Sequence, residues 1–208
     1  MDLRARLLVL TLFAATLTLA ACHESVHDPK TYDREAQYLG LNDQSVAVIV
    51  AMSDQTEYRY PDARQQIARE ITRRIAISVP GIDVVNPDVL IQWQAENPYW
   101  TARPPSMVIE ALNVDRVVMV EIGEYRMTDP GDTNIKRGVI SGNVNVIEAD
   151  AADPDNFGFT QSVRLSFPDE FRTRVGLPAA SVDDIRTITV SRFTEDVAGL
   201  FYDHSVIR

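Results

Sequence analysis

Two hydrophobic periodicities follow one another in the first half of the chain. The run Val46–Met52 is almost continuously apolar and β-branched, which predicts a strand covered on both faces. After a polar loop over Ser53–Tyr60, apolar residues recur every four positions from Ala63 to Val79, the spacing of an amphipathic helix. Pro80-Gly81 then predicts the end of that helix.

Shorter elements are predicted next. Ile82–Val85 has the composition of a short strand, and Asn86-Pro87-Asp88 has the residues that favour a helix start, with the helix running to about Glu96. A second short helix is predicted over Ser106–Leu112, and Asn113 after it suits a left-handed C-cap.

The second half of the chain alternates apolar and polar residues. Strands are predicted over Val114–Met127, Arg137–Glu148 and Ser162–Phe167, and together they indicate an antiparallel meander with one solvated face. In the first of them Ile122, Glu124 and Arg126 are expected on one face. A final helix is predicted from Ser181 to near Tyr202.

The resulting order is β-α-β-α-(α)-β-β-β-α, which predicts an α/β fold. We expect a single domain over residues 45–208, with a mixed sheet and a C-terminal helix. Residues 22–44 are polar and are interpreted as a tether, with a short helix near Tyr32–Leu39.

The N-terminal residues have the pattern of a removable signal. Arg4 and Arg6 precede the apolar run Leu7–Leu19, which is shorter than the roughly 20 residues of a membrane-spanning helix and typical of a signal peptide over residues 1–21. The residues Leu19-Ala20-Ala21-Cys22 that follow resemble the bacterial lipobox. The resemblance implies that Cys22 becomes the first mature residue and carries acyl chains such as palmitate. An ordinary secreted protein cleaved near Ala21 is the alternative.

The resemblance to bacterial lipoproteins also implies a location. His23, rather than Asp, follows the cysteine, which in that family is compatible with the outer membrane. We therefore expect a lipid-anchored protein that faces the periplasm, with the inner membrane as the alternative.

Composition removes several classes of function. The 208 residues include 30 acidic and 20 basic side chains, so the net charge is −10. Such acidity argues against nucleic acid as a partner and against a basic membrane-binding surface. A single cysteine excludes a disulfide framework and a cysteine-based zinc site.

One sequence motif matches a metal site in letters only. His23-Glu24-Ser25-Val26-His27 has the H-E-x-x-H spacing of zinc metalloproteases, in which both histidines lie on one helix face. Here it follows directly after Cys22, and Asp28-Pro29 would limit the helix to barely one turn. We interpret it as solvated tether.

The remaining chemistry is sparse. No nucleophile or phosphate-binding motif is present, and histidine is nearly absent from the domain, so we expect no enzyme, no metal and no cofactor. Glu121 and Glu124 are interpreted as part of a solvated face. The acidic loop Asp150–Asn156 favours an exposed turn, with calcium binding as the alternative.

Three aromatic residues are the candidate contact site for a partner. Trp93, Tyr99 and Trp100 lie in or beside a loop that contains three prolines, and aromatic anchors are common in interfaces. The alternative is that these rings cover the domain's own core.

Three segments resemble a group of bacterial envelope lipoproteins that includes the curli-secretion lipoprotein and the lipoprotein activators of penicillin-binding proteins. They are Val46–Met52 with its helix, Ile82–Val85 and Ala111–Val120. The relatives differ in function, so we expect a non-catalytic lipoprotein that binds or assembles another envelope component. An oligomeric secretion-pore subunit of the curli-secretion type and a small envelope hydrolase are the alternatives, and the sequence does not define the oligomeric state.

Overall fold

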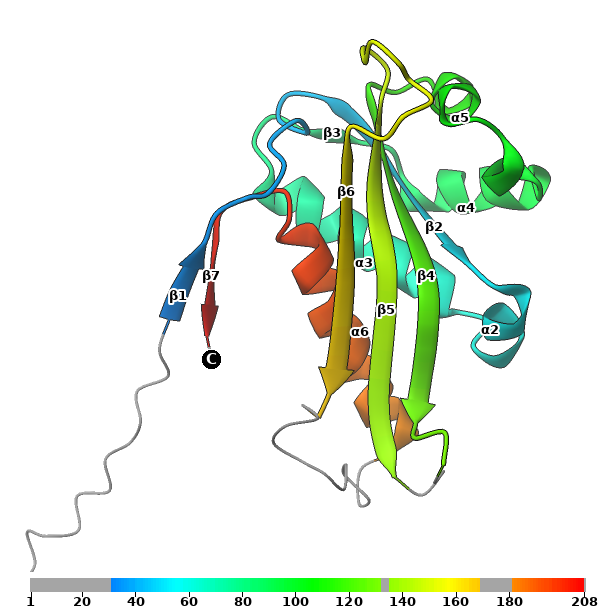
Figure 1. The fold of residues 1–208 in the computed structure, drawn as a ribbon, viewed down its shortest axis with the longest axis vertical. Coiled ribbons are helices and arrows are strands. Elements are labelled where there is room, and N and C mark those ends of the chain that lie inside the picture. Colours follow the sequence, from blue (N-terminus) through cyan, green and yellow to red (C-terminus); the bar gives the residue numbers. More distant parts are fainter. Residues whose placement is uncertain (1–30, 132–134, 169–180, 208) are drawn as a thin grey trace, which may run out of the picture. The chain divides into compact units, whose positions relative to one another are not determined.

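A five-stranded mixed sheet organises the domain (Figure 1). The computed structural model describes residues 31–131, 135–168 and 181–207, so the predicted signal peptide, Cys22 and the His23–His27 motif lie outside the described residues. The strands are β2 (Ser45–Met52), β3 (Asp83–Val84), β4 (Arg116–Thr128), β5 (Lys136–Glu148) and β6 (Phe159–Phe167). Their order across the sheet is β3-β2-β4-β5-β6. Strand β2 is parallel to β3 and β4, whereas the β4–β5 and β5–β6 pairs are antiparallel, which confirms the predicted mixed α/β fold.

The main hydrophobic core lies on the face of the sheet that is covered by α3 (Ala63–Ser78) and α6 (Val182–Ala198). The apolar stripe of α3 is fully buried there, as the four-residue spacing predicts. On the other face, α4 (Pro87–Glu96), the 3₁₀ turn η2 (Trp100–Ala102) and α5 (Pro105–Leu112) pack on a smaller core over β2 and the first half of β4. Among the described residues, no helix is both long and apolar enough to span a bilayer.

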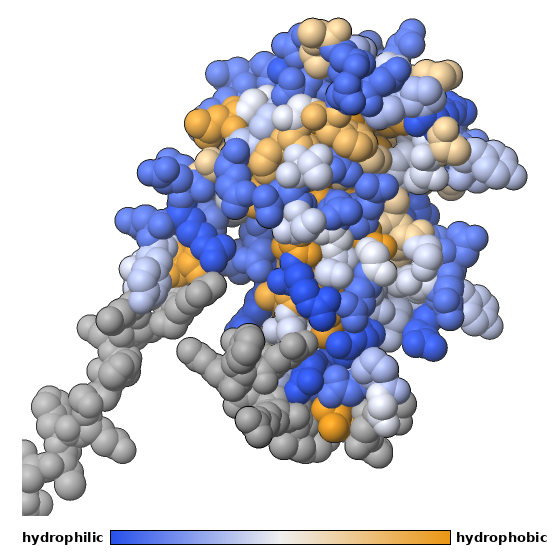
Figure 2. Space-filling view, in the orientation of Figure 1, coloured by the Kyte–Doolittle hydropathy of each residue, from blue (hydrophilic) through white to orange (hydrophobic). Residues whose placement is uncertain are grey.

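The rest of that second face, over β4, β5 and β6, is open to solvent and largely polar. Figure 2 shows this side of the molecule, where hydrophilic residues surround separate hydrophobic spots. The alternation predicted for β5 is present, with Ile140, Val144 and Val146 in the main core. Asn145 alternates with these residues and lies on the other face of β5, where it is buried because it lies between Glu121 and Thr160 and bonds to both.

A β-bulge changes the pattern predicted for β4. The pairing register with β5 shifts between Ile122 and Glu124, so one residue is added at this point of β4. Ile122 therefore faces the main core, whereas Glu124 and Arg126 lie on the open face and Tyr125 is buried in the core. The prediction that Ile122, Glu124 and Arg126 share a face was wrong, because strict alternation holds only where the register is unbroken.

Several short elements were not predicted. The turn expected over Ser53–Tyr60 contains the helix α2 (Asp54–Arg59), whose N-cap Ser53 accepts a hydrogen bond from the Thr56 amide. None of its residues is buried, so its sequence lacks the apolar periodicity from which a helix is predicted. A separate two-stranded sheet joins β1 (Thr31–Arg34) to β7 (His204–Ile207), where a helix near Tyr32–Leu39 was expected. Helix α6 ends at Ala198, earlier than the predicted Tyr202.

The packed domain begins before residue 45. Leu41 is fully buried in the main core, and the amides of Gln37 and Tyr38 both donate to the Leu200 carbonyl, at 2.8 and 3.0 Å. The part of the predicted tether that follows β1 is thus fixed to the domain, because one buried leucine and backbone hydrogen bonds outweigh its polar composition.

The outer edge of β2 is completed by a side chain. Strand β3 pairs only with Ser45 and Val46, and farther along the edge the buried Gln94 of α4 donates a hydrogen bond from Nε2 to the Val50 carbonyl at 3.0 Å. A backbone acceptor buried without a partner would cost free energy, so this amide stabilises the part of the β2 edge that β3 does not cover.

Replacing this side chain tests its role. Gln94→Leu keeps a similar volume but leaves the Val50 carbonyl without its donor, and we expect the free energy of unfolding to fall by about 1–3 kcal/mol. The control is Gln92→Leu on the exposed side of α4, where the amide bonds only to Glu96, and a change within about 0.5 kcal/mol is expected. Urea unfolding followed by circular dichroism measures both, and equal losses would contradict the edge-capping role.

Candidate functional site

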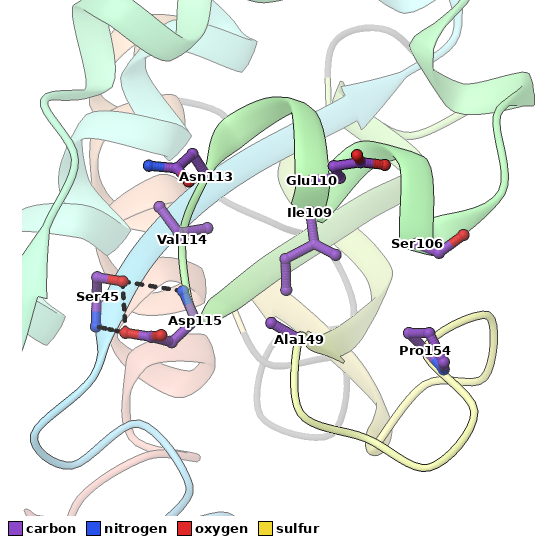
Figure 3. A pocket seen from close by; sticks show the side chains of 9 residues that line it. All are labelled: Ser45, Ser106, Ile109, Glu110, Asn113, Val114, Asp115, Ala149 and Pro154. Carbon is purple, nitrogen blue, oxygen red and sulfur yellow. Dashed lines mark hydrogen bonds between the residues drawn. The ribbon is translucent and has the colours of Figure 1, made fainter.

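An open hollow of about 490 Å³ lies at one end of the sheet, where β2 and β4 begin and β5 ends (Figure 3). Ser45 comes from the start of β2, and Asn113, Val114 and Asp115 form the turn that leads into β4. Helix α5 contributes Ser106, Ile109 and Glu110, and the segment after β5 contributes Ala149 and Pro154. The hollow therefore combines two carboxylates with apolar side chains.

The two parallel strands are joined at their starts by a side-chain clamp. The Ser45 hydroxyl and amide both donate to Asp115 Oδ2, at 2.6 and 2.9 Å, and the Asp115 amide donates back to Ser45 Oγ at 2.9 Å (Figure 3). Asn113 adopts the predicted left-handed conformation with φ of 52°, which turns the chain from α5 toward β4. The hydrogen bonds from Ser45 lower the pKa of Asp115.

This clamp predicts a pH effect with a defined sign. Because the pKa of Asp115 in the folded protein lies below its ordinary value of 3.8, its contribution to stability is present above that value and is lost as the pH falls through the folded pKa. Ser45→Ala removes the hydroxyl donor, so the pKa of Asp115 is expected to rise toward 3.8. Carbon-detected NMR titration of the carboxyl group measures it. Ser45→Thr keeps the hydroxyl and is the control; an unchanged pKa in Ser45→Ala would contradict the clamp.

A second polar cluster lies next to the clamp and includes a buried arginine. The Arg116 guanidinium forms an ion pair with Asp150 at 2.7 Å and donates to the carbonyls of Gly40 and Asp115, at 3.2 and 2.8 Å. The hydrogen bond from Arg116 lowers the pKa of Asp150. Arg116 therefore fixes the segment before β2 to the start of β4.

The Tyr38 ring belongs to the same region. Its hydroxyl donates to Glu148, the residue that lies opposite Arg116 in the β4–β5 ladder, and its ring packs against Phe159 and Phe201. Burial and the hydrogen bond to Glu148 raise the pKa of Tyr38, so the hydroxyl stays a neutral donor. These contacts were not predicted, because Tyr38 appears as an isolated aromatic residue in a polar stretch.

The acidic loop does not present converging oxygen ligands. Asp150 is engaged by Arg116, Asp155 accepts from the Ser106 amide at 3.1 Å, and Asp153 bonds to Asn156. Among the described residues no three His, Cys, Asp or Glu side chains form a group that could hold a metal ion. The carboxylates of Asp150–Asn156 thus have structural partners in different directions, which does not favour the calcium alternative.

The two glutamates of β4 lie on the open sheet face. Glu124 accepts hydrogen bonds from Arg126 at 2.8 Å and from Arg164 at 2.6 Å, and Glu121 accepts from Asn145 at 2.8 Å. Partial burial opposes ionisation of Glu124, but the two arginines outweigh it and lower its pKa. Both residues form part of a paired polar surface.

The structure separates the three candidate aromatic residues. The Trp100 ring is only 5% exposed and belongs to the smaller core, and Trp93 packs against it with ring centroids 6.3 Å apart. Tyr99 is 80% exposed. Trp100 therefore covers the domain's own core, whereas the Tyr99 ring is exposed to solvent.

Comparisons with known proteins give structural neighbours only. No protein-family model matches the chain, and no curated protein sequence matches it. The PelC dodecamer from Paraburkholderia phytofirmans is 10% identical, with a TM-score of 0.46 over 83% of this chain and 97% of that one. The lipoprotein GNA1162 from Neisseria meningitidis is 12% identical, with a TM-score of 0.46 over 74% of this chain and 97% of that one. Protein XCC0632 from Xanthomonas campestris is 9% identical, with a TM-score of 0.47 over 82% of this chain and 91% of that one. Likenesses at these values carry no argument about function.

Proposed function

We propose that this chain is a lipid-anchored protein of the bacterial envelope whose α/β domain binds or assembles another envelope component without catalysing a reaction. The observation that carries the proposal is the sequence Leu19-Ala20-Ala21-Cys22 after a basic and apolar leader. In this proposal the protein faces the periplasm from the outer membrane.

The spacing between Cys22 and the folded part supports a role close to the membrane. Eight residues lie between Cys22 and Thr31, the first residue of β1, so nine Cα-to-Cα steps separate the two. Even fully extended, that length reaches only roughly 30 Å at 3.3–3.6 Å per residue. A partner of this domain would therefore be a component at or near the membrane surface.

The arrangement of the polar groups supports a non-catalytic role. Asp115, Asp150 and Glu124 are each held by hydrogen bonds or ion pairs to other residues of the domain. A general acid or base needs a pKa close to the working pH, whereas the pKa of each of these carboxyls is lowered. They stabilise the fold in their charged form and suit no proton transfer near neutral pH.

The lipid anchor can be tested through Cys22. The wild type is expected to incorporate an alkyne analogue of palmitate and to sediment with membranes, and Cys22→Ala is expected to lose both properties. Ser25→Ala, in the same segment, serves as the control and is expected to behave like the wild type. Labelling and sedimentation of Cys22→Ala at the wild-type level would overturn the anchoring part of the proposal.

Partner binding can be tested with two exposed tyrosines. A photo-crosslinking amino acid at Tyr99, 80% exposed beside the smaller core, is expected to give a discrete adduct in intact cells. The same substitution at Tyr58, 93% exposed on α2, is the matched control and is expected to give none. Equal adducts at both positions, or none at Tyr99, would contradict this contact. Turnover of a cell-wall or peptide substrate by the purified full chain would overturn the non-catalytic part.

A further inference from the structure

We propose that strand β6 pairs with β6 of a second copy of this chain, in antiparallel orientation and centred on Val163. The order of the five-stranded sheet ends at β6, and among the described residues no strand pairs with its outer side. The opposite edge of the sheet is completed by β3 and by the Gln94 side chain. The two edges therefore differ. Other groups partly complete the outer edge of β2, whereas β6 presents the outward backbone N–H and C=O groups of a long strand.

Strand β6 lacks the usual features that prevent edge pairing. Isolated edges are commonly protected by lysines, prolines, bulges or shortness. This strand has nine residues, pairs with β5 in an unbroken register from Phe159 to Phe167, and contains no proline and a single charged residue, Arg164. It is therefore regular enough to accept another strand, whose backbone would replace the Gln161 side-chain amide that donates to the Ser162 carbonyl at 3.0 Å.

The sequence of β6 is complementary to itself when reversed. Antiparallel pairing centred on Val163 places aromatic against aromatic in the outer pair (Phe159 with Phe167) and hydroxyl against hydroxyl in the next (Thr160 with Ser166). The two inner pairs are Gln161 with Leu165 and Ser162 with Arg164. A two-fold interface requires such self-complementarity, because the same patch meets itself. This self-complementarity favours a second copy of this chain, rather than an unrelated protein, as the partner of the β6 edge.

The apolar side chains of β6 are only partly covered within one copy. Phe159, Val163, Leu165 and Phe167 pack against the main core, yet all four stay half-buried. Next to them Ile188 of α6 is 36% exposed, and it lies one turn from Arg192, which sits over the Phe167 ring at 4.7 Å. Residues one turn apart share a helix face, so Ile188 also lies on the β6 side of α6. A second β6 strand would cover these partly exposed apolar side chains.

The charges on the open face permit the same pairing. Ser162 would lie directly opposite the partner's Arg164, so no like charges face one another. The two Arg164 residues would be diagonal neighbours, and each is accompanied by a Glu124 carboxylate at 2.6 Å. Two neutralised arginines can approach where two isolated ones would repel each other.

Charges introduced at Ser162 test the proposal with opposite expected signs. Ser162→Arg places two arginines directly opposite and is expected to raise the dimer dissociation constant by about two- to thirtyfold, because the two-fold interface contains the pair twice. Ser162→Glu places a carboxylate opposite Arg164 and is expected to lower the constant. Thr101→Arg and Thr101→Glu on η2, also exposed, are the controls and should change nothing. Sedimentation of the full-length protein in mild detergent measures the constants.

The register is tested by a distance. In Thr160→Cys, a spin label on each copy is expected about 20 Å from its mate, since residues 160 of the two strands are offset by six positions at about 3.4 Å each. The wild type, whose sole cysteine is Cys22, corrects for background labelling. The proposal is overturned by a strict monomer, by a ring of more than two subunits, by a dimer that responds equally to both Ser162 charges, or by a distance far from 20 Å. None of these results bears on lipidation of Cys22 or on adducts at Tyr99.

Discussion

Leu41→Ala is expected to lower the free energy of unfolding by about 2–5 kcal/mol, the range for deleting a fully buried leucine side chain. Leu41 is completely inaccessible to solvent and packs in the main core, although it lies in a stretch that is mostly polar. The cavity would form beside the start of β2, between elements whose backbone hydrogen bonds limit their collapse. The loss should therefore include a cavity contribution as well as the transfer of the side chain to water.

Leu39→Ala is the matched control, two residues away in the same segment. Its side chain is 60% exposed, so the expected change is within about 0.5 kcal/mol. Urea unfolding of both variants, followed by circular dichroism, separates the two cases. If both leucines gave the same small change, the segment before β2 would act as a tether after all, and the domain would begin near residue 45.

The elements with a strong hydrophobic period could be predicted from the sequence. The buried strand at Val46–Met52 and the helix from Ala63 form the centre of the main core, and their patterns repeat over several turns or residue pairs. The turn at Asn113 was also predictable, because asparagine tolerates the left-handed conformation that ends α5. In these places local preference and tertiary packing favour the same structure.

What could not be predicted depends on contacts between distant residues. The bulge near Gly123 shifts the phase of β4, and nothing in the local alternation shows where a register breaks. Tyr38 and Leu41 acquire their roles only when Glu148, Phe159 and the main core lie beside them. Exposed Tyr99 and buried Trp100 are adjacent in sequence, so composition alone could not separate a contact residue from a core residue.

The candidate site shows the same division. The C-cap at Asn113 after α5 was predicted, but the clamp between Asp115 and Ser45 joins residues 70 positions apart. Such a pair forms because two neighbouring parallel strands begin at the same end of the sheet, which is a property of the topology. The oxygen-rich loop at Asp150–Asn156 is the opposite case, since its composition suggested a ligand set that the fold uses for separate contacts.

Gly142→Ala is expected to destabilise the domain by about 3 kcal/mol, toward the upper end of the range for overpacking a close contact. A Cβ atom at this position would lie 2.4 Å from the Glu121 carbonyl oxygen and 3.1 Å from its carbon. The obstructing atoms belong to the backbone of β4 beside the bulge, so no side-chain rotation can relieve the contact. Relief would require β4 and β5 to separate at the centre of the sheet.

Gly123→Ala is the control for this substitution on the neighbouring strand. A Cβ atom there meets nothing within 4 Å, and the backbone does not have a positive φ. Removing glycine at such a position restricts the unfolded chain, so the domain is expected to be unchanged or up to about 1 kcal/mol more stable. Thermal unfolding of the two variants should give midpoints that move apart. Two midpoints that fall together would show that the β4 backbone yields at the bulge, and the close approach of Glu121 to Gly142 would then not constrain the sheet.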